Sequence, residues 1–193
     1  MEHILVELMS QLTQLSEEEK TAITESFPIK TFEKGSYLMK QGKLAKNAYY
    51  VIEGCIREFE LIGGEEKTTG FFIENESAAN FNSLANQIPS NRSFVCEEKT
   101  TVAILSAEKE QQLYDKYPRF ETFCRSGMEQ MLGNEKEQLA ELITLKPEQR
   151  YLKLLQEKPD LLNRIPQYHV ASFLGIKPET LSRIRKRIVL KKE

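Results

Sequence analysis

Apolar residues near the start of the chain recur at helical spacing: Ile4, Leu5, Leu8, Met9, Leu12 and Leu15. The run Ser16-Glu17-Glu18-Glu19 has the form of a capping box, so a second helix is expected to begin there and to end near Ser26. Further along, helical spacing returns and predicts one long helix from about Pro118 to Thr144.

Between about Ile29 and Leu105 the pattern changes to short alternating segments separated by glycines. The expected strands are Tyr37–Lys40, Ala48–Ile52, Cys55–Leu61, Lys67–Phe72 and Ser93–Leu105. Gly63-Gly64, between two of these segments, indicates a hairpin. Many short strands joined by turn glycines predict a sandwich or a roll.

The long helix carries an apolar stripe made of Phe120, Phe123, Cys124, Met128, Met131, Leu132, Leu139, Leu142 and Ile143. This stripe is longer than a small roll can cover, so it indicates a dimer seam that Glu135 interrupts. A helix that packs only within its own chain is the alternative.

After Lys146-Pro147, residues Pro147–Glu157 are expected to form a helix with Tyr151, Leu154 and Leu155 inward. The window Gln167–Lys186 then has the pattern of a helix-turn-helix. Gly175 can adopt the positive φ that the turn needs, and Pro178 suits the first turn of the second helix. Ala171 is small, which leaves room for the second helix to cross at this position. The apolar residues expected to face inward are Val170, Leu174, Ile176, Leu181 and Ile184, whereas His169 is expected to face outward.

The charge of the chain is divided unevenly between its two ends. Residues 146–193 carry 12 Lys and Arg against 5 Asp and Glu, a net +7, whereas residues 1–145 carry 15 against 24, a net −9. A basic module on an acidic body is typical of phosphate binding. The run Arg185–Lys192 is placed for backbone contacts, although Lys191 and Lys192 could instead be a frayed terminus. A helical hairpin with a solvated basic face is the alternative.

Composition limits the remaining classes of function. The 193 residues are 40% hydrophobic and 29% charged, with no apolar run near the roughly 20 residues of a membrane span. No signal peptide is recognisable at the start, and Cys55, Cys96 and Cys124 are far apart, which predicts a reducing cytoplasm. With only His3 and His169, and with no metal-ligand spacing or phosphate loop, we expect no metal, no cofactor and no enzyme.

Roll, long helix and helix-turn-helix, in this order, resemble the Crp/Fnr family of bacterial transcription regulators. Residues 32–42 and 49–54 resemble the cyclic-nucleotide-binding fold of that family, and residues 148–151 and 174–186 resemble its Bacteroidetes branch. The resemblance implies an α+β fold: a double-stranded, jelly-roll-like β-roll (1–117), a dimerisation helix (118–145) and a winged-helix-like DNA-binding domain (146–193). It also implies a homodimer on double-stranded DNA, with RNA polymerase as a candidate partner.

The second helix of the helix-turn-helix resembles the Fnr-like subgroup, because Glu179, Ser182 and Arg183 match its Glu-x-x-Ser-Arg pattern. A carboxylate can accept from cytosine N4, and an Arg can read guanine O6 and N7. Pro178 replaces an Arg found in other members, so we expect a TTGA-like half-site in an inverted repeat. The residues expected to hold phosphates are Lys177, Thr180, Arg185, Lys186 and Arg187. A plain surface ion pair between Glu179 and Arg183 is the alternative.

The ligand pocket implied by the resemblance comprises Ala79, Asn80, Phe81, Arg92 and Ser93. Arg92-Ser93 matches the phosphate-binding pair of cyclic-nucleotide receptors. However, Ala79 stands where the family has a glycine and Asn80 where it has the ribose-binding Glu. Cyclic AMP is therefore not expected, and the effector is unknown. A different anion could bind Arg92, but we favour an empty pocket in which Arg92 is a structural ion-pair partner.

The sequence thus predicts a homodimeric, sequence-specific transcription regulator. An Fnr-like oxygen sensor is excluded, because the N-terminal segment has no cysteine cluster. The rival interpretation is a ligand-binding or protein-interaction module whose helix-turn-helix no longer reads DNA.

Overall fold

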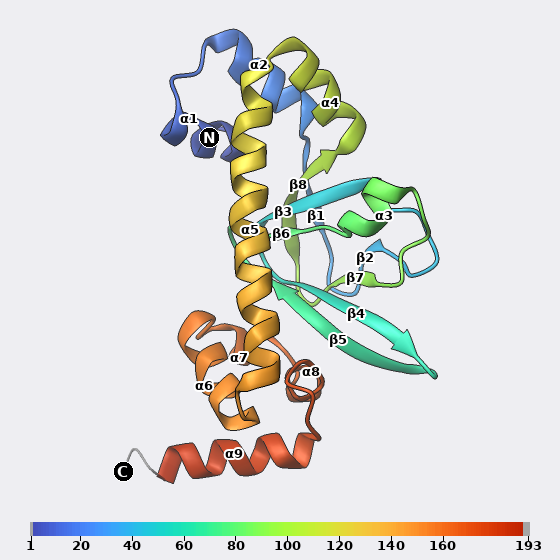
Figure 1. The fold of residues 1–193 in the computed structure, drawn as a ribbon, viewed down its shortest axis with the longest axis vertical. Coiled ribbons are helices and arrows are strands. Elements are labelled where there is room, and N and C mark those ends of the chain that lie inside the picture. Colours follow the sequence, from blue (N-terminus) through green and yellow to red (C-terminus); the bar gives the residue numbers. More distant parts are fainter. Residues whose placement is uncertain (1, 191–193) are drawn as a thin grey trace.

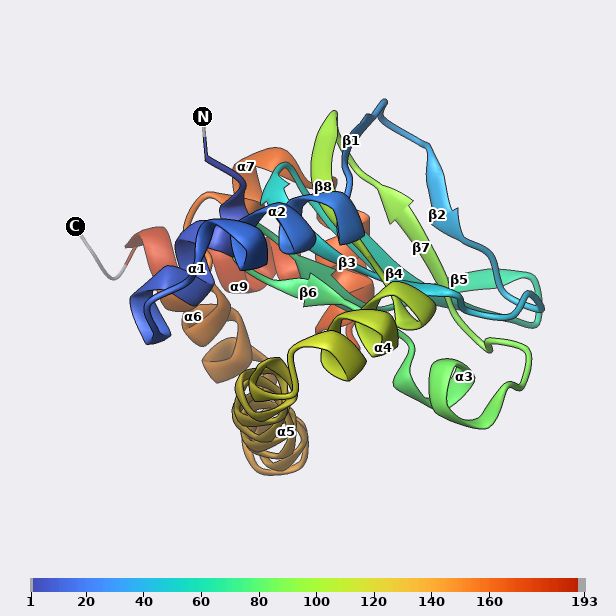
Figure 2. The same ribbon diagram turned by 90° about the horizontal axis from the view of Figure 1, so that it is seen from above.

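The computed structural model describes residues 2–190, so the predicted contacts of Lys191 and Lys192 lie outside the described residues. A long helix runs through the molecule, with small helices at one end, a β-roll beside its middle and the C-terminal helices at the other end (Figure 1). Seen along the long helix, the roll lies entirely to one side of it (Figure 2). Among the described residues, no helix is both long and apolar enough to cross a membrane.

The N-terminal helices are α1 (Ile4–Leu12) and α2 (Glu17–Ser26). The predicted capping box of α2 is confirmed: the Glu19 N–H donates to Ser16 Oγ at 3.3 Å, and the Ser16 N–H donates to the Glu19 carboxylate at 2.8 Å. Leu15 lies beyond the end of α1 but is still buried, because the loop folds back onto the cluster that also contains Ile23 and Phe120.

Two four-stranded antiparallel sheets form the roll, in the orders β1-β8-β3-β6 and β2-β7-β4-β5, which confirms the predicted fold class. The strands are β1 (Ile29–Phe32), β2 (Tyr37–Met39), β3 (Asn47–Glu53), β4 (Ile56–Ile62), β5 (Glu65–Phe72), β6 (Ser77–Ala78), β7 (Ser93–Cys96) and β8 (Thr100–Ser106). The two sheets enclose a core that includes Val51, Ile56, Phe94 and Val102. Gly63 and Gly64 both have positive φ at the β4–β5 turn, so the predicted hairpin is confirmed.

The prediction of one strand over Ser93–Leu105 is wrong. β7 and β8 belong to different sheets and are separated by a bend at residues 97–99. Glu97 and Glu98 lie in this bend, where they pair with Arg57 and Arg164. The chain therefore changes sheet where two carboxylates meet cationic partners. Strands β1 and β6 were not among the predicted segments, and neither were helices α3 (Phe81–Asn86) and α4 (Ala107–Lys116).

Helix α5 (Arg119–Thr144) agrees with the predicted long helix. Phe120 is fully buried against the N-terminal helices. Towards the other end of α5 the apolar side chains are exposed, and Leu139 and Ile143 keep 59% and 78% of their accessible surface. A single chain therefore leaves much of the apolar stripe of α5 uncovered.

The C-terminal helices are α6 (Pro147–Glu157), α7 (Leu161–Arg164), α8 (Gln167–Phe173) and α9 (Pro178–Leu190). Helix α8 packs against β5, while α9 lies across the end of the molecule, away from the sheets (Figure 1). The C-terminal helices are thus docked on the roll, with α8 against β5, and α9 is left outside.

Candidate nucleic-acid interface

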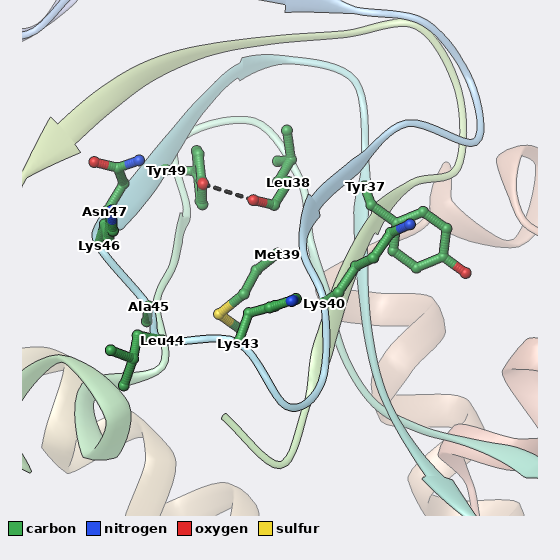
Figure 3. A pocket seen from close by; sticks show the side chains of 10 residues that line it. All are labelled: Tyr37, Leu38, Met39, Lys40, Lys43, Leu44, Ala45, Lys46, Asn47 and Tyr49. Atoms are coloured by element: carbon green, nitrogen blue, oxygen red, sulfur yellow. Dashed lines mark hydrogen bonds between the residues drawn. The ribbon is translucent and has the colours of Figure 1, made fainter. Parts of the chain in front are cut away.

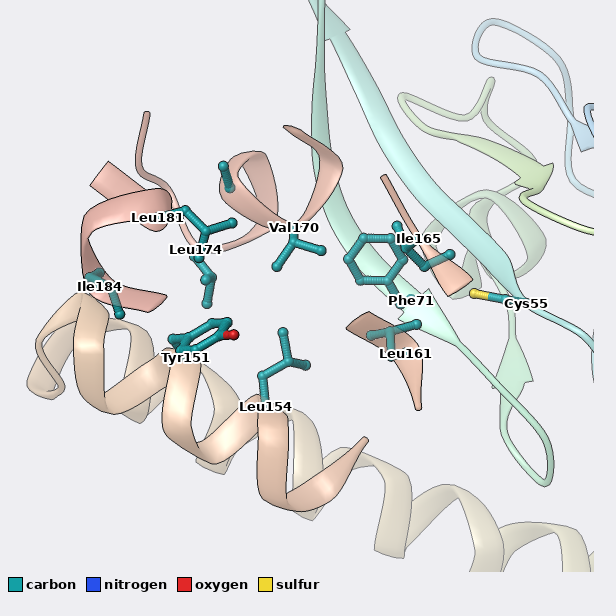
Figure 4. Packing of buried hydrophobic residues seen from close by; sticks show 11 residues of the cluster. Cys55, Phe71, Tyr151, Leu154, Leu161, Ile165, Val170, Leu174, Leu181 and Ile184 are labelled. Atoms are coloured by element: carbon teal, nitrogen blue, oxygen red, sulfur yellow. The ribbon is translucent and has the colours of Figure 1, made fainter. Parts of the chain in front are cut away.

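The inner face of the helix-turn-helix is packed as its sequence pattern predicts. Val170, Leu174, Leu181 and Ile184 are buried together with Tyr151 of α6 (Figure 4). Ile176 is only partly buried and packs at the edge of this cluster. The cluster fixes the angle between α8 and α9, so it determines which residues of α9 remain outside.

The turn between the two helices has the predicted backbone. Gly175 has φ +67°, a left-handed conformation that L side chains rarely adopt. Its N–H donates to the Ser172 carbonyl at 3.0 Å, and the Ile176 N–H donates to the Ala171 carbonyl at 3.0 Å. Pro178 begins α9, where its missing N–H costs no helical hydrogen bond.

Helix α9 presents its polar residues to solvent. Of the eight residues expected to contact DNA, Thr180 is half-buried and the other seven are exposed: Lys177, Glu179, Ser182, Arg183, Arg185, Lys186 and Arg187. Leu181 and Ile184 occupy the opposite, buried face of the helix. The structure therefore gathers one carboxylate, two hydroxyls and five cations on α9 and the residue before it.

Three of these side chains, Thr180, Arg183 and Arg187, have partners within the chain. Arg183 Nη2 donates to Thr180 Oγ1 at 3.3 Å, and Arg187 Nη1 donates to Glu148 Oε2 at 2.7 Å. Within the described part of the chain, no ion pair joins Glu179 to Arg183. The carboxylate of Glu179 and the guanidinium of Arg183 therefore do not neutralise each other.

Apolar contacts join the helix-turn-helix to the roll. Cys55 and Phe71 of the roll lie in the same buried cluster as α6 to α9 (Figure 4). The rings of Phe71 and Phe173 meet edge to face, with centroids 5.4 Å apart. A hydrogen bond of 3.0 Å from the Thr68 N–H to Ser172 Oγ lies beside this contact. The two domains thus share one core.

Ion pairs surround this shared core. Arg164 of α7 donates to Glu74 at 2.8 Å and to Glu98 at 2.8 Å. Lys158 donates to Glu76 at 2.6 Å and to the Phe71 carbonyl at 2.8 Å. Hydrogen bonds from Arg164 lower the pKa of Glu74 from 4.5 to about 2. We call these Arg164 and Lys158 pairs the docking contacts, because they hold the helix-turn-helix on the roll.

The prediction that His169 faces outward is wrong. His169 is buried, and its Nε2 lies 3.7 Å from Glu97, which also pairs with the buried Arg57. His169 is buried because α8 packs against the roll, which covers a side of the helix that would otherwise meet water. Burial, and secondly the charge of Arg57, lower the pKa of His169 below its ordinary value.

Arg150 joins α5 to the helix-turn-helix and was not identified from the sequence as a functional residue. Its guanidinium donates to the carbonyls of Leu142 and Leu145 at the end of α5, at 2.9 and 3.2 Å. It also donates to the Leu174 carbonyl at 2.6 Å, beside the turn. Arg150 links the end of α5 to the turn 24 residues further along the chain, a contact that no spacing pattern indicated.

The predicted ligand pocket is occupied by contacts within the roll. Arg92 Nη1 lies 3.1 Å from both oxygens of Glu58, whose side chain is almost fully buried. Thr69 Oγ1 donates to the same carboxylate at 2.7 Å. A carboxylate of the chain itself therefore lies where the resemblance placed a bound phosphate.

Two other predicted pocket residues, Asn80 and Ser93, also make hydrogen bonds within the roll. Asn80 caps α3 by accepting from the Ser83 N–H at 3.0 Å, and its amide donates to Ser90 Oγ at 2.8 Å. Ser93 Oγ accepts from the Gln41 N–H at 2.9 Å. Ala79 is half-buried and Phe81 is exposed. The described residues contain no group of three or more His, Cys, Asp or Glu side chains that could hold a metal ion.

Residues 29–117 match the cyclic nucleotide-binding domain family. Comparison with curated proteins found no relative of this chain. Among solved structures, FixK2 from Bradyrhizobium japonicum is 14% identical with a TM-score of 0.72, covering 86% of each chain.

Two further structures are similar over most of their length. The c-di-GMP responsive global regulator CLP of Xanthomonas campestris is 16% identical with a TM-score of 0.69, covering 92% of this chain and 93% of CLP. The Thermus thermophilus catabolite activator protein is 22% identical with a TM-score of 0.54, covering 92% of this chain and 85% of its own. Residues 29–117 are therefore a cyclic nucleotide-binding-like domain, carried by a chain that has the fold of Crp/Fnr-type regulators.

Proposed function

We propose that this chain is a sequence-specific transcription regulator that binds double-stranded DNA as a homodimer, with RNA polymerase as a candidate partner. The observation that carries the proposal is the exposed polar face of α9, set on a packed helix-turn-helix. An exposed helix of this kind fits the major groove, and its cations contribute the phosphate contacts that dominate affinity.

Glu179, Ser182 and Arg183 are the proposed base-reading residues, and a TTGA-like half-site is the proposed target. All three side chains are exposed on α9. The Glu179 carboxylate lies on a surface rich in cations and would repel the DNA phosphates unless it makes a specific contact. Cytosine N4 offers a hydrogen-bond donor for that contact. The phosphate contacts are assigned to Lys177, Thr180, Arg185, Lys186 and Arg187.

Dimerisation is assigned to the 118–145 helix. Its exposed apolar residues include Met128, Leu132, Leu139, Leu142 and Ile143. A two-fold pair of these helices would cover this stripe and place two recognition helices on an inverted repeat, where half-sites lie about one helical turn apart.

DNA binding is proposed to need no cyclic AMP. Glu58 already neutralises Arg92, so an incoming phosphate would have to displace a buried carboxylate that also accepts from Thr69. Removing the cation from a buried carboxylate is costly, which opposes that exchange. The docking contacts, meanwhile, hold the helix-turn-helix on the roll with α9 facing away from the sheets.

The test is selection of bound sites from a random DNA pool, using the full chain without added ligand. Enrichment of an inverted repeat with TTGA-like half-sites is expected. Arg183→Ala should then cost about 1–3 kcal/mol on the selected site and relax one base position. Lys186→Ala, the matched change at a phosphate contact, should weaken specific and random DNA alike.

Equal losses on both DNAs for the two variants would overturn the division into base and phosphate contacts. If no sequence is enriched in either the absence or presence of cyclic nucleotides, the chain is not a DNA reader. The helix-turn-helix would then serve protein contacts.

A further inference from the structure

A cavity of about 310 Å³ lies between strand β2, the loop formed by residues 40–46 and the start of β3. Strand β2 contributes Tyr37 and Met39 to its lining, and the loop contributes Lys43 and Lys46 (Figure 3). Neither Arg92 nor Glu58 is among the lining residues, so this cavity is separate from the predicted ligand pocket. Cavities of this size are at the lower end of the range that takes small organic molecules.

Positive charge is concentrated at this cavity. Lys40, Lys43 and Lys46 all line it, and residues 40–46 contain no acidic side chain. This contrasts with the net −9 of residues 1–145, which comes from 15 Lys and Arg against 24 Asp and Glu. Three like charges in seven residues repel one another, and a bound anion would relieve that repulsion.

The three ammonium groups are not neutralised within the described part of the chain. No ion pair or hydrogen bond joins them to a carboxylate there. The Lys40 ammonium lies 4.8 Å from the centre of the Tyr37 ring, a cation–π contact that leaves its charge in place. In the docking contacts, by contrast, the cations of Lys158 and Arg164 are paired with Glu76 and Glu74.

Apolar side chains also line the cavity. Met39, Ala45 and Tyr49 are buried, and all three line it. Tyr49 Oη is occupied, because it donates to the Leu38 carbonyl at 2.8 Å (Figure 3). A ligand would therefore meet both lysine cations and apolar side chains.

The loop that carries the lysines is held in place by its backbone. The Gly42 N–H donates to the Ser90 carbonyl at 2.7 Å, and the Ser90 N–H returns a bond to the Lys43 carbonyl at 2.8 Å. The Ala45 N–H donates to Ser83 Oγ at 2.9 Å. Gly42 has φ +83°, which the tight turn requires. The lysines thus project from a fixed frame, and this lowers the entropy cost of binding.

We propose that this cavity binds a small organic phosphate carrying more than one negative charge. Lysine ammoniums are compact point charges that suit phosphate oxygens, and three lysines among the lining residues favour a multiply charged group. The organic part would lie over Met39 and Tyr49. The site is independent of the proposed DNA binding and could exist without it.

The test uses ADP as the probe, measured by titration calorimetry on the full chain at constant ionic strength. Lys43→Ala/Lys46→Ala removes two of the lining lysine charges, and Lys30→Ala/Lys34→Ala removes two exposed lysines of the same roll that do not line the cavity. The matched pair separates a local site from a general charge effect, because both variants change the net charge equally. Thermal melting establishes that both variants are folded.

The cavity variant should bind ADP at least about tenfold more weakly, while the control should stay within about twofold of the parent chain. ADP should also move the backbone amide signals of Ala45 and Asn47 in the NMR spectrum more than that of Ser93. No saturable binding by the parent chain, or equal weakening in both variants, would overturn the proposal. Shifts centred on Ser93 would overturn it too, because they would place the ligand at Arg92.

Discussion

Replacing Arg164 with alanine should loosen the helix-turn-helix from the roll. Arg164 bridges Glu74 and Glu98, and its side chain is only 22% exposed. The lowering of the Glu74 pKa from 4.5 to about 2 gives a first magnitude. At about 1.4 kcal/mol per pKa unit, the full lowering corresponds to roughly 3 kcal/mol.

That figure is an upper bound on what Arg164 contributes through Glu74. The Glu74 side chain is 35% exposed, so solvent screens part of the attraction. Part of the lowered pKa also comes from backbone hydrogen bonds, including the one that the Gly54 N–H donates to Glu74. We therefore expect Arg164→Ala to lower the free energy of unfolding by about 1–2 kcal/mol.

Urea unfolding monitored by circular dichroism measures this free energy, and amide hydrogen exchange in α8 reports the local opening. The matched control is Arg125→Ala, which removes the Arg125–Glu129 pair on α5, where the side chains are 64% and 65% exposed. That pair should contribute no more than about 0.5 kcal/mol. If Arg164→Ala lowers stability no more than the control does, the docking contacts do not stabilise the domain arrangement.

Further predictions concern pH, the turn and the dimer. Because the pKa of Glu74 is lower in the folded chain, the ionised carboxylate stabilises the fold fully above about pH 4.5, and this stabilisation is lost as pH falls towards 2. The difference in unfolding free energy between the parent chain and Glu74→Gln should therefore shrink over this range in urea titrations. Burial and the charge of Arg57 lower the pKa of His169 in the folded chain, against the opposing attraction of Glu97 and Glu66, so stability should fall below about pH 6.5 more steeply than in His169→Gln. Gly175→Ala should cost about 1 kcal/mol in thermal melting, because φ is +67° although nothing crowds the added Cβ. Leu139→Glu places a charge in the exposed apolar stripe of α5 and should convert a dimer into a monomer in analytical ultracentrifugation. An unchanged mass would contradict the assignment of α5 to the dimer interface.

The parts of the fold that follow local rules could be predicted from the sequence. The capping box at Ser16, the hairpin at Gly63-Gly64, the long helix and the turn at Gly175 all depend on residues within a few positions of one another. The exposed face of α9 follows from the same logic, because burial of one helical face leaves the other outside.

The sequence by itself therefore determined these elements and the residues of α9 that lie outside, because periodicity and backbone preference are encoded in neighbouring residues. Only the tertiary structure decided that Glu58 neutralises Arg92, that Arg164 docks the helix-turn-helix, and that His169 is buried. These pairs join residues tens of positions apart, so they depend on how the strands and helices come together in space, which no spacing along the chain records.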